Sequence, residues 1–335
     1  MKILGIETSC DETAVALVED GTKVIANLVS SQVELHQPFG GVVPELAARA
    51  HLENLLPLLA EAGGPRLLDE VGAIAYTQGP GLIGALLVGA LLARSLAFAR
   101  GIPAIGVNHL KAHLYAPCLS GKNLEFPLVG LIVSGGHTLL IEADSWDDSR
   151  VLGSTRDDAA GEAFDKVANL LDLGYPGGSR IEAAAAQGAP DRFAFPRGML
   201  RSGDYDFSFS GLKTAVRQEV EKFRSRGEAL PVADIAASFQ AAVVEVLAAK
   251  LTEAIRESAA ACAVLGGGVA INSVLRRRLA DEITLPGCRL LLSPPVLCGD
   301  NAAMIAGLAF QKIIRADRDG TGDVSPSLSW GKTLY

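Results

Sequence analysis

The sequence predicts an α/β protein built from two similar halves. Apolar strands alternate with helical segments through short connections, which is typical of α/β domains. Each half also opens with a β-hairpin, at residues 2–19 and 127–142, whose turn carries small or polar residues. Because a repeated supersecondary unit indicates a duplicated fold, we expect two α/β domains that each present a hairpin turn to a shared cleft, although two unrelated hairpins would give the same pattern.

Composition limits the class of protein. The chain has 335 residues, of which 49% are hydrophobic and 20% charged, so it is long enough for two domains and is not disordered overall. Its formal net charge is −8. Affinity for nucleic acid comes mainly from cationic contacts to phosphates, so this chain needs a local basic patch or a partner protein to hold RNA. Basic residues gather at 197–201, 222–226 and 276–278, although such runs are usually solvated surface.

Cysteine usage and apolar runs indicate the compartment. The five cysteines form no CxxC pair, which argues against a disulfide framework or a Cys-only zinc site and suits a reducing cytosol. The N-terminus reaches acidic residues within twelve positions, unlike a signal peptide. The longest apolar run, residues 81–93, is shorter than the about 20 residues of a membrane span. We therefore expect a soluble cytoplasmic protein with no membrane association.

The first half is predicted to alternate strands with helices. Pro44 at the first helical position, followed by an apolar stripe, predicts a helix from residue 44, and Asn108 suits the N-cap of a helix that follows it. Residues 82–99 predict a helix of small residues, and residues 36–43, with one Pro and two Gly, predict a mobile loop. Strands are expected at residues 2–6, 13–18, 71–76 and 105–107.

The second half repeats this plan around a less regular segment. Helices are expected at residues 232–257 and 272–280, and residues 143–230 are the most irregular part of the chain. Strands are expected at residues 127–133, 139–141, 263–265 and 290–292.

Two histidines and one distant acid suggest a metal site. His109 and His113 are four residues apart on a predicted helix, so both rings lie on one face and can share one ion, although surface or capping histidines give the same pattern. Asp300 lies between a predicted strand and a helix, where it either completes a three-ligand site or caps the helix. A zinc peptidase of the HExxH type needs a Glu after the first His, and Leu110 stands there instead.

The two hairpin turns differ in chemistry. Residues 134–138, SGGHT, hold Gly135 and Gly136, which let backbone N–H groups reach phosphate oxygens, although an ordinary glycine-rich turn has the same composition. The first turn carries Asp11 and Glu12. These acids would repel a phosphate and are better suited to a metal, a cationic group or proton transfer.

Two further glycine-rich turns expose backbone. Residues 266–268 are three glycines between a strand and a helix, which match neither GxGxxG nor a Walker A motif but let a flat purine or ribose lie against the chain. Residues 175–178, YPGG, form a similar turn. Asp165 and Glu182 flank it, where carboxylates either accept hydrogen bonds from ribose hydroxyls or are solvated surface groups.

In order along nearly the whole chain, these motifs resemble those of one family. They are GIETSCDET (5–13), GGVVPELAARAH (40–51), TQGPGLIGALLVG (77–89), NHLKAHL (108–114), VSGGHT (133–138), GEAFDKVA (161–168), YPGG (175–178), FSFSGLKT (207–214), GGGVAIN (266–272) and CGDNAAMIA (298–306). The chain resembles the tRNA threonylcarbamoyltransferase family, called TsaD in bacteria and Kae1 in archaea and eukaryotes. Its SGGHT and NHLxAH motifs are closer to the bacterial branch.

This resemblance implies a fold and a reaction. The fold is the duplicated actin-like α/β fold shared with sugar kinases and heat-shock ATPases, with two lobes around a nucleotide cleft. The N-terminal lobe would comprise residues 1–112 with about 301–335, and the C-terminal lobe residues 113–300 with an irregular insertion at about 143–230. The reaction is transfer of a threonylcarbamoyl group from threonylcarbamoyl-AMP to N6 of adenosine 37 in tRNAs that read ANN codons.

The resemblance also implies site residues. His109, His113 and Asp300 would hold one divalent metal, iron or zinc. Asp11 or Glu12 is our candidate for accepting the proton of the adenine amine, because both are acidic and lie at a hairpin turn. Bound ATP or threonylcarbamoyl-AMP would contact Val133, Ser134, Gly135, Gly136, His137, Asp165, Gly178, Glu182 and Asn272.

Partners and competing functions follow from the same comparison. We expect tRNA to bind weakly to this chain alone, with help from a TsaB-like paralogue docked on the N-terminal helices and from a TsaE-like ATPase. The helix at 82–99 is either that docking surface or a buried core helix. A sugar or acetate kinase on the same fold would use similar turns but has less use for the HxxxH motif and a distant Asp. A non-catalytic scaffold would lack the triad.

Overall fold

The chain forms two compact units. The computed structural model describes residues 1–284, 286–315 and 322–330. One unit comprises Met1–Leu124 with the described part of Ser293–Tyr335, and the other comprises Glu125–Leu292. Residues 113–124 and 293–300 thus belong to the first unit, which differs from the expected boundaries. The reason is that the helix holding His113 continues to Tyr115 and packs, with the turn after it, on the last helix of the chain.

The first unit is built on a five-stranded sheet with the order β3-β2-β1-β4-β5. Its first three strands form an antiparallel meander, whereas β1, β4 and β5 are parallel. The expected strands are all present, and β3 is a further strand that the sequence analysis did not predict. The strands are β1 (Lys2–Glu7), β2 (Glu12–Glu19), β3 (Lys23–Ser31), β4 (Val71–Gly79) and β5 (Ala104–Asn108).

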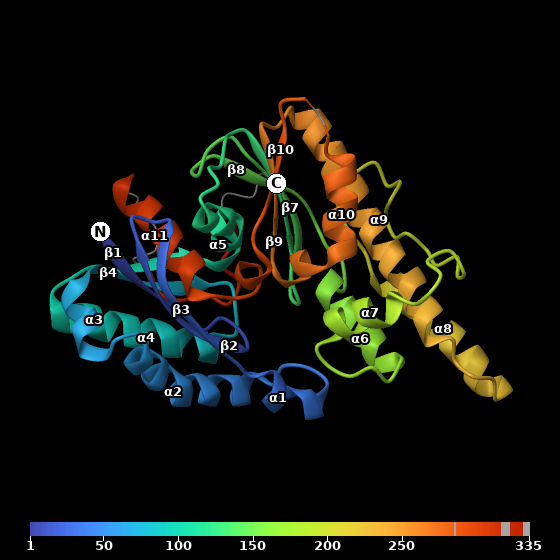
Figure 1. The fold of residues 1–335 in the computed structure, drawn as a ribbon, viewed down its shortest axis with the longest axis horizontal. Helices are drawn as coiled ribbons and strands as arrows, with labels where there is room; N and C mark the ends of the chain where they lie inside the picture. The colour runs from blue at the N-terminus through green and yellow to red at the C-terminus, as the bar shows by residue number, and fades with distance from the viewer. Residues whose placement is uncertain (285, 316–321, 331–335) are drawn as a thin grey trace. The chain divides into compact units, whose positions relative to one another are not determined.

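Helices cover both faces of this sheet. Figure 1 shows α2 and α4 on one side of the strands and α5 and α11 on the other. On the α2–α4 side, Leu55 and Ala93 belong to one buried core with Ile6 and Tyr76 of the strands. The segment at 36–43, expected as a loop, begins with a buried His36 and a short helical turn. The helices are α1 (Val33–His36), η1 (Gln37–Phe39), α2 (Pro44–Glu61), α3 (Gly64–Glu70), α4 (Ile83–Arg100), α5 (His109–Tyr115), η2 (Ala116–Ser120), η4 (Pro295–Leu297) and α11 (Ala302–Ile314).

The second unit repeats the strand plan. Its sheet has the order β10-β9-β6-β7-β8, again an antiparallel meander joined to two parallel strands. Position by position this matches the first sheet, so the duplication predicted from the two hairpins is confirmed. The strands are β6 (Leu128–Val133), β7 (Thr138–Ala143), β8 (Ser149–Ser154), β9 (Cys262–Gly266) and β10 (Arg289–Leu292).

The helices of the second unit include three that the sequence did not predict. The segment at about 143–230 is not irregular throughout, because it contains β8, α6, α7 and α8. Within this unit α9 packs on β6, α7 and α10 pack on α9, and α8 packs on α6 (Figure 1). The helices are α6 (Ala160–Leu170), α7 (Gly177–Ala185), α8 (Ser210–Arg226), α9 (Val232–Ser258), η3 (Gly268–Ile271) and α10 (Ser273–Glu282).

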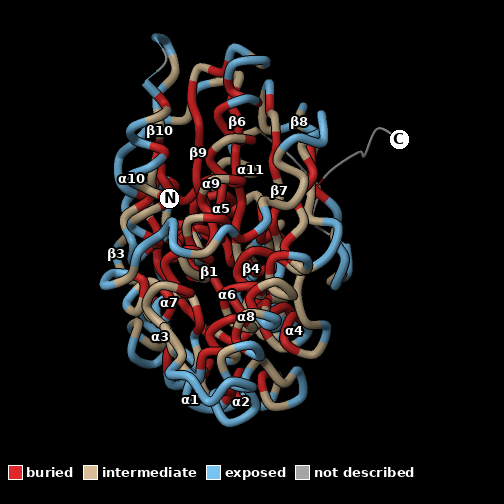
Figure 2. Tube along the Cα trace, turned by 90° about the vertical axis from the view of Figure 1, so that its right-hand side faces the viewer, coloured by how far each residue is buried: buried red, intermediate tan, exposed pale blue. Residues whose placement is uncertain are grey.

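Burial follows the central strands of both units. Figure 2 shows buried residues, in red, along β1, β4, β6 and β9. Two helices, α4 and α9, are long and apolar enough to cross a membrane by length and composition alone. Core helices of globular units meet the same test, and both helices pack against strands of their own unit. The helix predicted at 82–99 is α4, which continues past Arg94, the residue that ends the apolar run at 81–93, to Arg100.

Candidate functional site

Two histidines and one aspartate converge in the first unit. The Asn108 side chain accepts hydrogen bonds from the N–H groups of Leu110 and Lys111 at 3.0 and 3.2 Å, as predicted for an N-cap, so α5 begins at His109. His113 follows one turn later, and the two rings are 4.6 Å apart. The Nε2 atoms of His109 and His113 lie 3.5 and 3.1 Å from Oδ1 of Asp300. The structure therefore brings the three predicted residues together.

Asp300 is available because its neighbour caps the helix. The N-cap of α11 is Asn301, whose side chain accepts the N–H of Met304 at 3.1 Å. The alternative that Asp300 caps this helix is therefore wrong. Its carboxylate is directed at the two imidazoles instead.

A buried carboxylate that the sequence analysis missed supports His109. Glu7, at the end of β1, has no exposed surface, and its Oε2 lies 3.0 Å from Nδ1 of His109. The same carboxylate accepts hydrogen bonds from Thr77 Oγ1 at 2.6 Å and from the Ser9 N–H at 2.5 Å. A carboxylate on one ring nitrogen fixes the tautomer and leaves the other nitrogen free to bind a metal.

The charges of this cluster favour a cation at its centre. Burial opposes charge on His109, yet Asp300 and Glu7 together raise the pKa of its imidazole well above the usual value. Burial lowers the pKa of His113. Despite its own burial, Asp300 has a pKa held below the usual range by the two histidines. Two carboxylates thus favour positive charge at His109, which a metal ion bound at Nε2 beside Asp300 could supply in place of a proton.

The donor set fits one divalent metal. One ligand atom from each of His109, His113 and Asp300 lies within 4.8 Å of the others. Two imidazoles and one carboxylate with open positions are typical of iron and zinc sites. Among the residues that the structure describes, His113 Nδ1 is a buried nitrogen without a hydrogen-bond partner, whereas Nε2 of the same ring faces Asp300.

The Asp11–Glu12 turn joins β1 to β2 in the same unit. Burial, followed by the charges of Asp11 and Asp300, raises the pKa of Glu12 well above its usual value. Behind the turn, His51 lies 2.7 Å from Thr13 Oγ1 and 3.0 Å from the carbonyl oxygen of Cys10. The hydrogen bonds of His51 therefore hold the turn in place. Because its pKa is raised, Glu12 takes up a proton more readily than an exposed glutamate.

In the second unit, the SGGHT turn joins β6 to β7. The Ser134 N–H donates to the carbonyl oxygen of His137 at 2.8 Å, and the His137 N–H donates to Ser134 Oγ at 3.1 Å. Behind the turn, a Cβ on Gly161 would lie 2.5 Å from the carbonyl oxygen of Ser134, so only glycine lets α6 approach it. By contrast, a Cβ on Gly135 or Gly136 would have no protein atom within 4 Å, so these two glycines face open space.

The backbone of Val133 supports the neighbouring loop. A Cβ on Gly267, which has a φ of +90°, would overlap the backbone of Val133, so the glycine run after β9 lies directly against the end of β6. Gly268 and Gly178 face open space.

Three polar residues predicted to contact a nucleotide hold these loops in place. Asp165 accepts the N–H of Gly177 at 2.7 Å, and Glu182 accepts the N–H of Ser273 at 2.9 Å. Asn272 caps α10 by accepting the N–H of Leu275 at 2.9 Å. Each is thus a part of the protein framework at the start of a helix.

The loops together resemble an anion-binding surface. Helices α6, α7 and α10 begin at them, and a helix N-terminus carries a partial positive charge, although the N–H groups of Ala160, Gly177 and Ser273 at these starts are already bonded within the protein. Open glycines beside such helix starts allow close approach of phosphate and ribose.

Two duplicated sheets of this order, with glycine-rich turns at their strand ends, define an actin-like α/β protein. A solved structure with the same fold is component A of the Acidaminococcus fermentans (R)-2-hydroxyglutaryl-CoA dehydratase. It is 17% identical, with a TM-score of 0.55, over 94% of this chain and 99% of that one.

Sequence relatives then identify the family. Residues 23–307 match the family described as TsaD, tRNA N6-adenosine threonylcarbamoyltransferase. The protein of that name from Moorella thermoacetica is 51% identical over 317 residues, which cover 94% of this chain and 93% of the relative. The one from Thiobacillus denitrificans is 52% identical over 322 residues, 95% and 93% of the two chains. The chain belongs to the tRNA N6-adenosine threonylcarbamoyltransferase family, a family of acyltransferases that modify tRNA.

Proposed function

We propose that this chain transfers the threonylcarbamoyl group of threonylcarbamoyl-AMP to N6 of adenosine 37 in tRNAs that read ANN codons. The observation that carries the proposal is the convergence of His109, His113 and Asp300 in a chain of this family. A kinase on the same fold would have no evident use for that triad.

The triad is proposed to hold one divalent iron or zinc ion. Glu7 would orient the His109 ring through Nδ1, so that Nε2 meets the ion. A metal with open positions supplies a Lewis acid that polarises carbonyl oxygens of the donor.

The chemistry needs positioning more than covalent catalysis. The donor is a mixed carbamic–phosphoric anhydride with AMP as a good leaving group. The adenine N6 attacks the carbamoyl carbon, a C–N bond forms, the C–O bond to AMP breaks, and the amine loses one proton. Because the adenine amine is a weak nucleophile, holding it near the donor and removing that proton are the main tasks of the protein.

Asp11 or Glu12 is proposed to accept the proton. The raised pKa of Glu12 makes it the stronger candidate of the two, since a base with a pKa closer to neutrality accepts a proton more effectively. Replacing both, as Asp11→Asn and Glu12→Gln, should slow transfer with donor and metal bound. An unchanged rate would remove this role.

The loops of the second unit are proposed to hold the nucleotide part of the donor, or ATP. Backbone N–H groups at Gly135 and Gly136, the hydroxyl of Ser134 and the ring of His137 would bind phosphate, with Val133 at the end of β6 beside them. Gly178 offers open backbone beside the turn that Asp165 fixes. Glu182 on α7 and Asn272 at the start of α10, which also bond within the protein, would face the ribose and base.

A partner surface lies on α2 and α4. Leu52 and Leu56 of α2, and Leu87 and Leu91 of α4, are exposed although apolar, and each pair is four residues apart on one helix face. The two helices pack on each other, and we propose that these exposed side chains together form one docking surface. Monomeric proteins rarely expose such patches, and a partner with a similar pair of helices, as a TsaB-like paralogue with this fold would have, matches it.

A single substitution tests this surface. Leu91 is 69% exposed, so Leu91→Glu should leave the melting temperature unchanged while abolishing co-elution with the paralogue in size-exclusion chromatography. An intact complex would show that the partner binds elsewhere. We further propose that a TsaE-like ATPase joins this complex in the cytoplasm and that tRNA binds weakly without these partners.

The function itself is tested by following isotope-labelled threonine from threonylcarbamoyl-AMP to tRNA, with and without the partner proteins. Label in tRNA that depends on this chain is the expected result. Phosphorylation of an added sugar by ATP, without labelling of tRNA, would support the kinase instead.

A further inference from the structure

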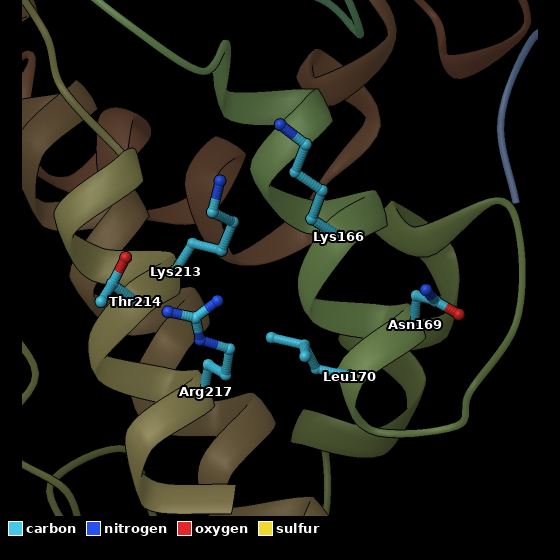
Figure 3. A pocket seen from close by; sticks show the side chains of 6 residues that line it. All are labelled: Lys166, Asn169, Leu170, Lys213, Thr214 and Arg217. Atoms are coloured by element: carbon cyan, nitrogen blue, oxygen red, sulfur yellow. The ribbon is translucent and has the colours of Figure 1, made fainter. Parts of the chain in front are cut away.

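We propose that the groove between α6 and α8 binds a phosphate of the tRNA backbone. The inference rests on the proposed function only in taking tRNA as the polyanion. The groove is a cavity of about 230 Å³. Figure 3 shows the cationic side chains of Lys166 from α6 and of Lys213 and Arg217 from α8 around the space between the two helices. Asn169, Leu170 and Thr214 complete the lining.

The position of α8 is fixed by two adjacent aspartates. Asp157 accepts hydrogen bonds from the N–H groups of Phe209 and Ser210 at 2.8 and 3.1 Å, at the start of the helix. Asp158 accepts from Lys166 at 2.8 Å and from Lys213 at 2.7 Å. Asp158 thus holds an ammonium group of each helix at the groove, and Lys166 also pairs with Glu162 at 2.7 Å. The two lysines are therefore fixed by carboxylates of the protein, which leaves Arg217 as the main cation for a ligand.

Arg217 is the cation with the weakest internal partner. Its side chain is 58% exposed. It pairs with the carboxylate of Glu221, which is 3.8 Å away and 65% exposed. Exposed pairs of this kind contribute little, so a phosphate can replace Glu221 at low cost. A guanidinium also binds phosphate through two parallel hydrogen bonds, which an ammonium cannot do.

The cationic face continues beyond the groove. At 3.6 residues per turn, Lys213, Arg217 and Arg224 fall on one side of α8. Arg224 donates to the carbonyl oxygen of Leu170, which lines the same groove on α6. Over its length α8 carries five basic residues, Lys213, Arg217, Lys222, Arg224 and Arg226, against two acidic ones, Glu219 and Glu221.

Size and charge point to part of a large polyanion. Pockets that enclose whole small molecules usually measure about 300–1,000 Å³, so this cavity accepts a phosphate group rather than a complete nucleotide. In a chain with a net charge of −8, a basic helix face is the local patch that RNA needs. A row of cations suits the repeated phosphates of RNA.

The test measures tRNA affinity of the chain assembled with its partner proteins. In Arg217→Gln, loss of one phosphate contact should weaken tRNA binding about four- to sixfold at 0.15 M salt and reduce the slope of log Kd against log salt by about 0.7–0.9. The kcat for transfer and the melting temperature should not change. Arg217→Lys should keep most of the affinity because it keeps the charge.

Arg150→Gln is the matched control, since Arg150 on β8 is equally exposed and pairs with one carboxylate, on Glu142. It should leave the affinity and the salt slope as they are. An unchanged affinity and slope in Arg217→Gln would overturn the inference while tRNA labelling by the same enzyme still supported the proposed function. Weaker assembly with the partner proteins at unchanged tRNA affinity would also overturn it, by assigning the groove to a protein.

Discussion

Replacing Glu7 with glutamine should weaken metal binding without unfolding the protein. The substitution keeps the size of the side chain and removes its charge. Glu7 lies on the opposite side of the His109 ring from Asp300, because it faces Nδ1 whereas Asp300 faces Nε2. A glutamine there supplies at best a neutral hydrogen bond, so the imidazole becomes less basic and its orientation less fixed.

The size of the effect follows from the contacts that are lost. A hydrogen bond to a charged group contributes about 1.5–3 kcal/mol, and Glu7 is 3.0 Å from His109 in a fully buried place. About 1.4 kcal/mol corresponds to a factor of ten, so metal affinity should fall by about 10- to 100-fold. A loss of this size is usual when a residue that hydrogen-bonds a metal ligand is replaced. Ser9 Oγ, at 3.3 Å from the same nitrogen, keeps the loss from being larger.

The assay is metal affinity by chelator competition, with metal content by mass spectrometry and a thermal melt beside it. Thr77→Val is the control, because it removes the other side-chain bond to the same carboxylate without touching His109. It should cost stability of about 1 kcal/mol and less metal affinity than Glu7→Gln. Equal metal affinities in Glu7→Gln and the natural protein would refute the reasoning.

Other changes should separate the parts of the site. His109→Ala should lose bound metal and transfer activity together while still melting cooperatively, which metal analysis and calorimetry check. Glu12→Gln should remove the acidic limb of the pH–rate profile: since burial raises the pKa of Glu12, the natural enzyme loses its base as pH falls through a value above the usual 4.5. Gly161→Ala should destabilise the fold by about 1–3 kcal/mol in denaturant titration, because its Cβ would meet the backbone of Ser134. The Cβ of Gly136→Ala would contact no protein atom within 4 Å, so this variant should fold normally but bind nucleotide more weakly in calorimetry. An equal nucleotide affinity would place the ligand elsewhere.

Much of the fold could be predicted because its signals are local. The strand pairs around the two turns follow from apolar runs of suitable length, and Pro44 and Asn108 mark helix starts in the structure as predicted. The sequence analysis missed helices α6 to α8, although buried apolar residues recur at helical spacing in α6 (Ala160–Leu170) and in α8, at Leu212, Val216 and Val220. Glycines and charged residues between these elements obscured that pattern. Their positions depend on distant bonds such as that of Asp157 to the start of α8.

The candidate site could likewise be predicted only where its residues give a local sequence signal. His109 and His113 could be paired from helical spacing alone, and Asp300 could be added because it ends a strand-to-helix loop. Glu7 could not, because it lies 102 residues from His109 at the end of a largely apolar strand, and only the parallel sheet brings them together. The framework role of Asn272 was likewise invisible, since a loop asparagine reads equally as a ligand contact or a cap.

The central claim is that a metal held by the triad is required for transfer to tRNA. The most direct measurement is labelling of tRNA from threonylcarbamoyl-AMP by the complete complex, before and after chelation and again after metal is restored. We predict that labelling is lost on chelation, returns with iron or zinc, and never appears with His109→Ala. Full labelling by metal-free His109→Ala would contradict the account.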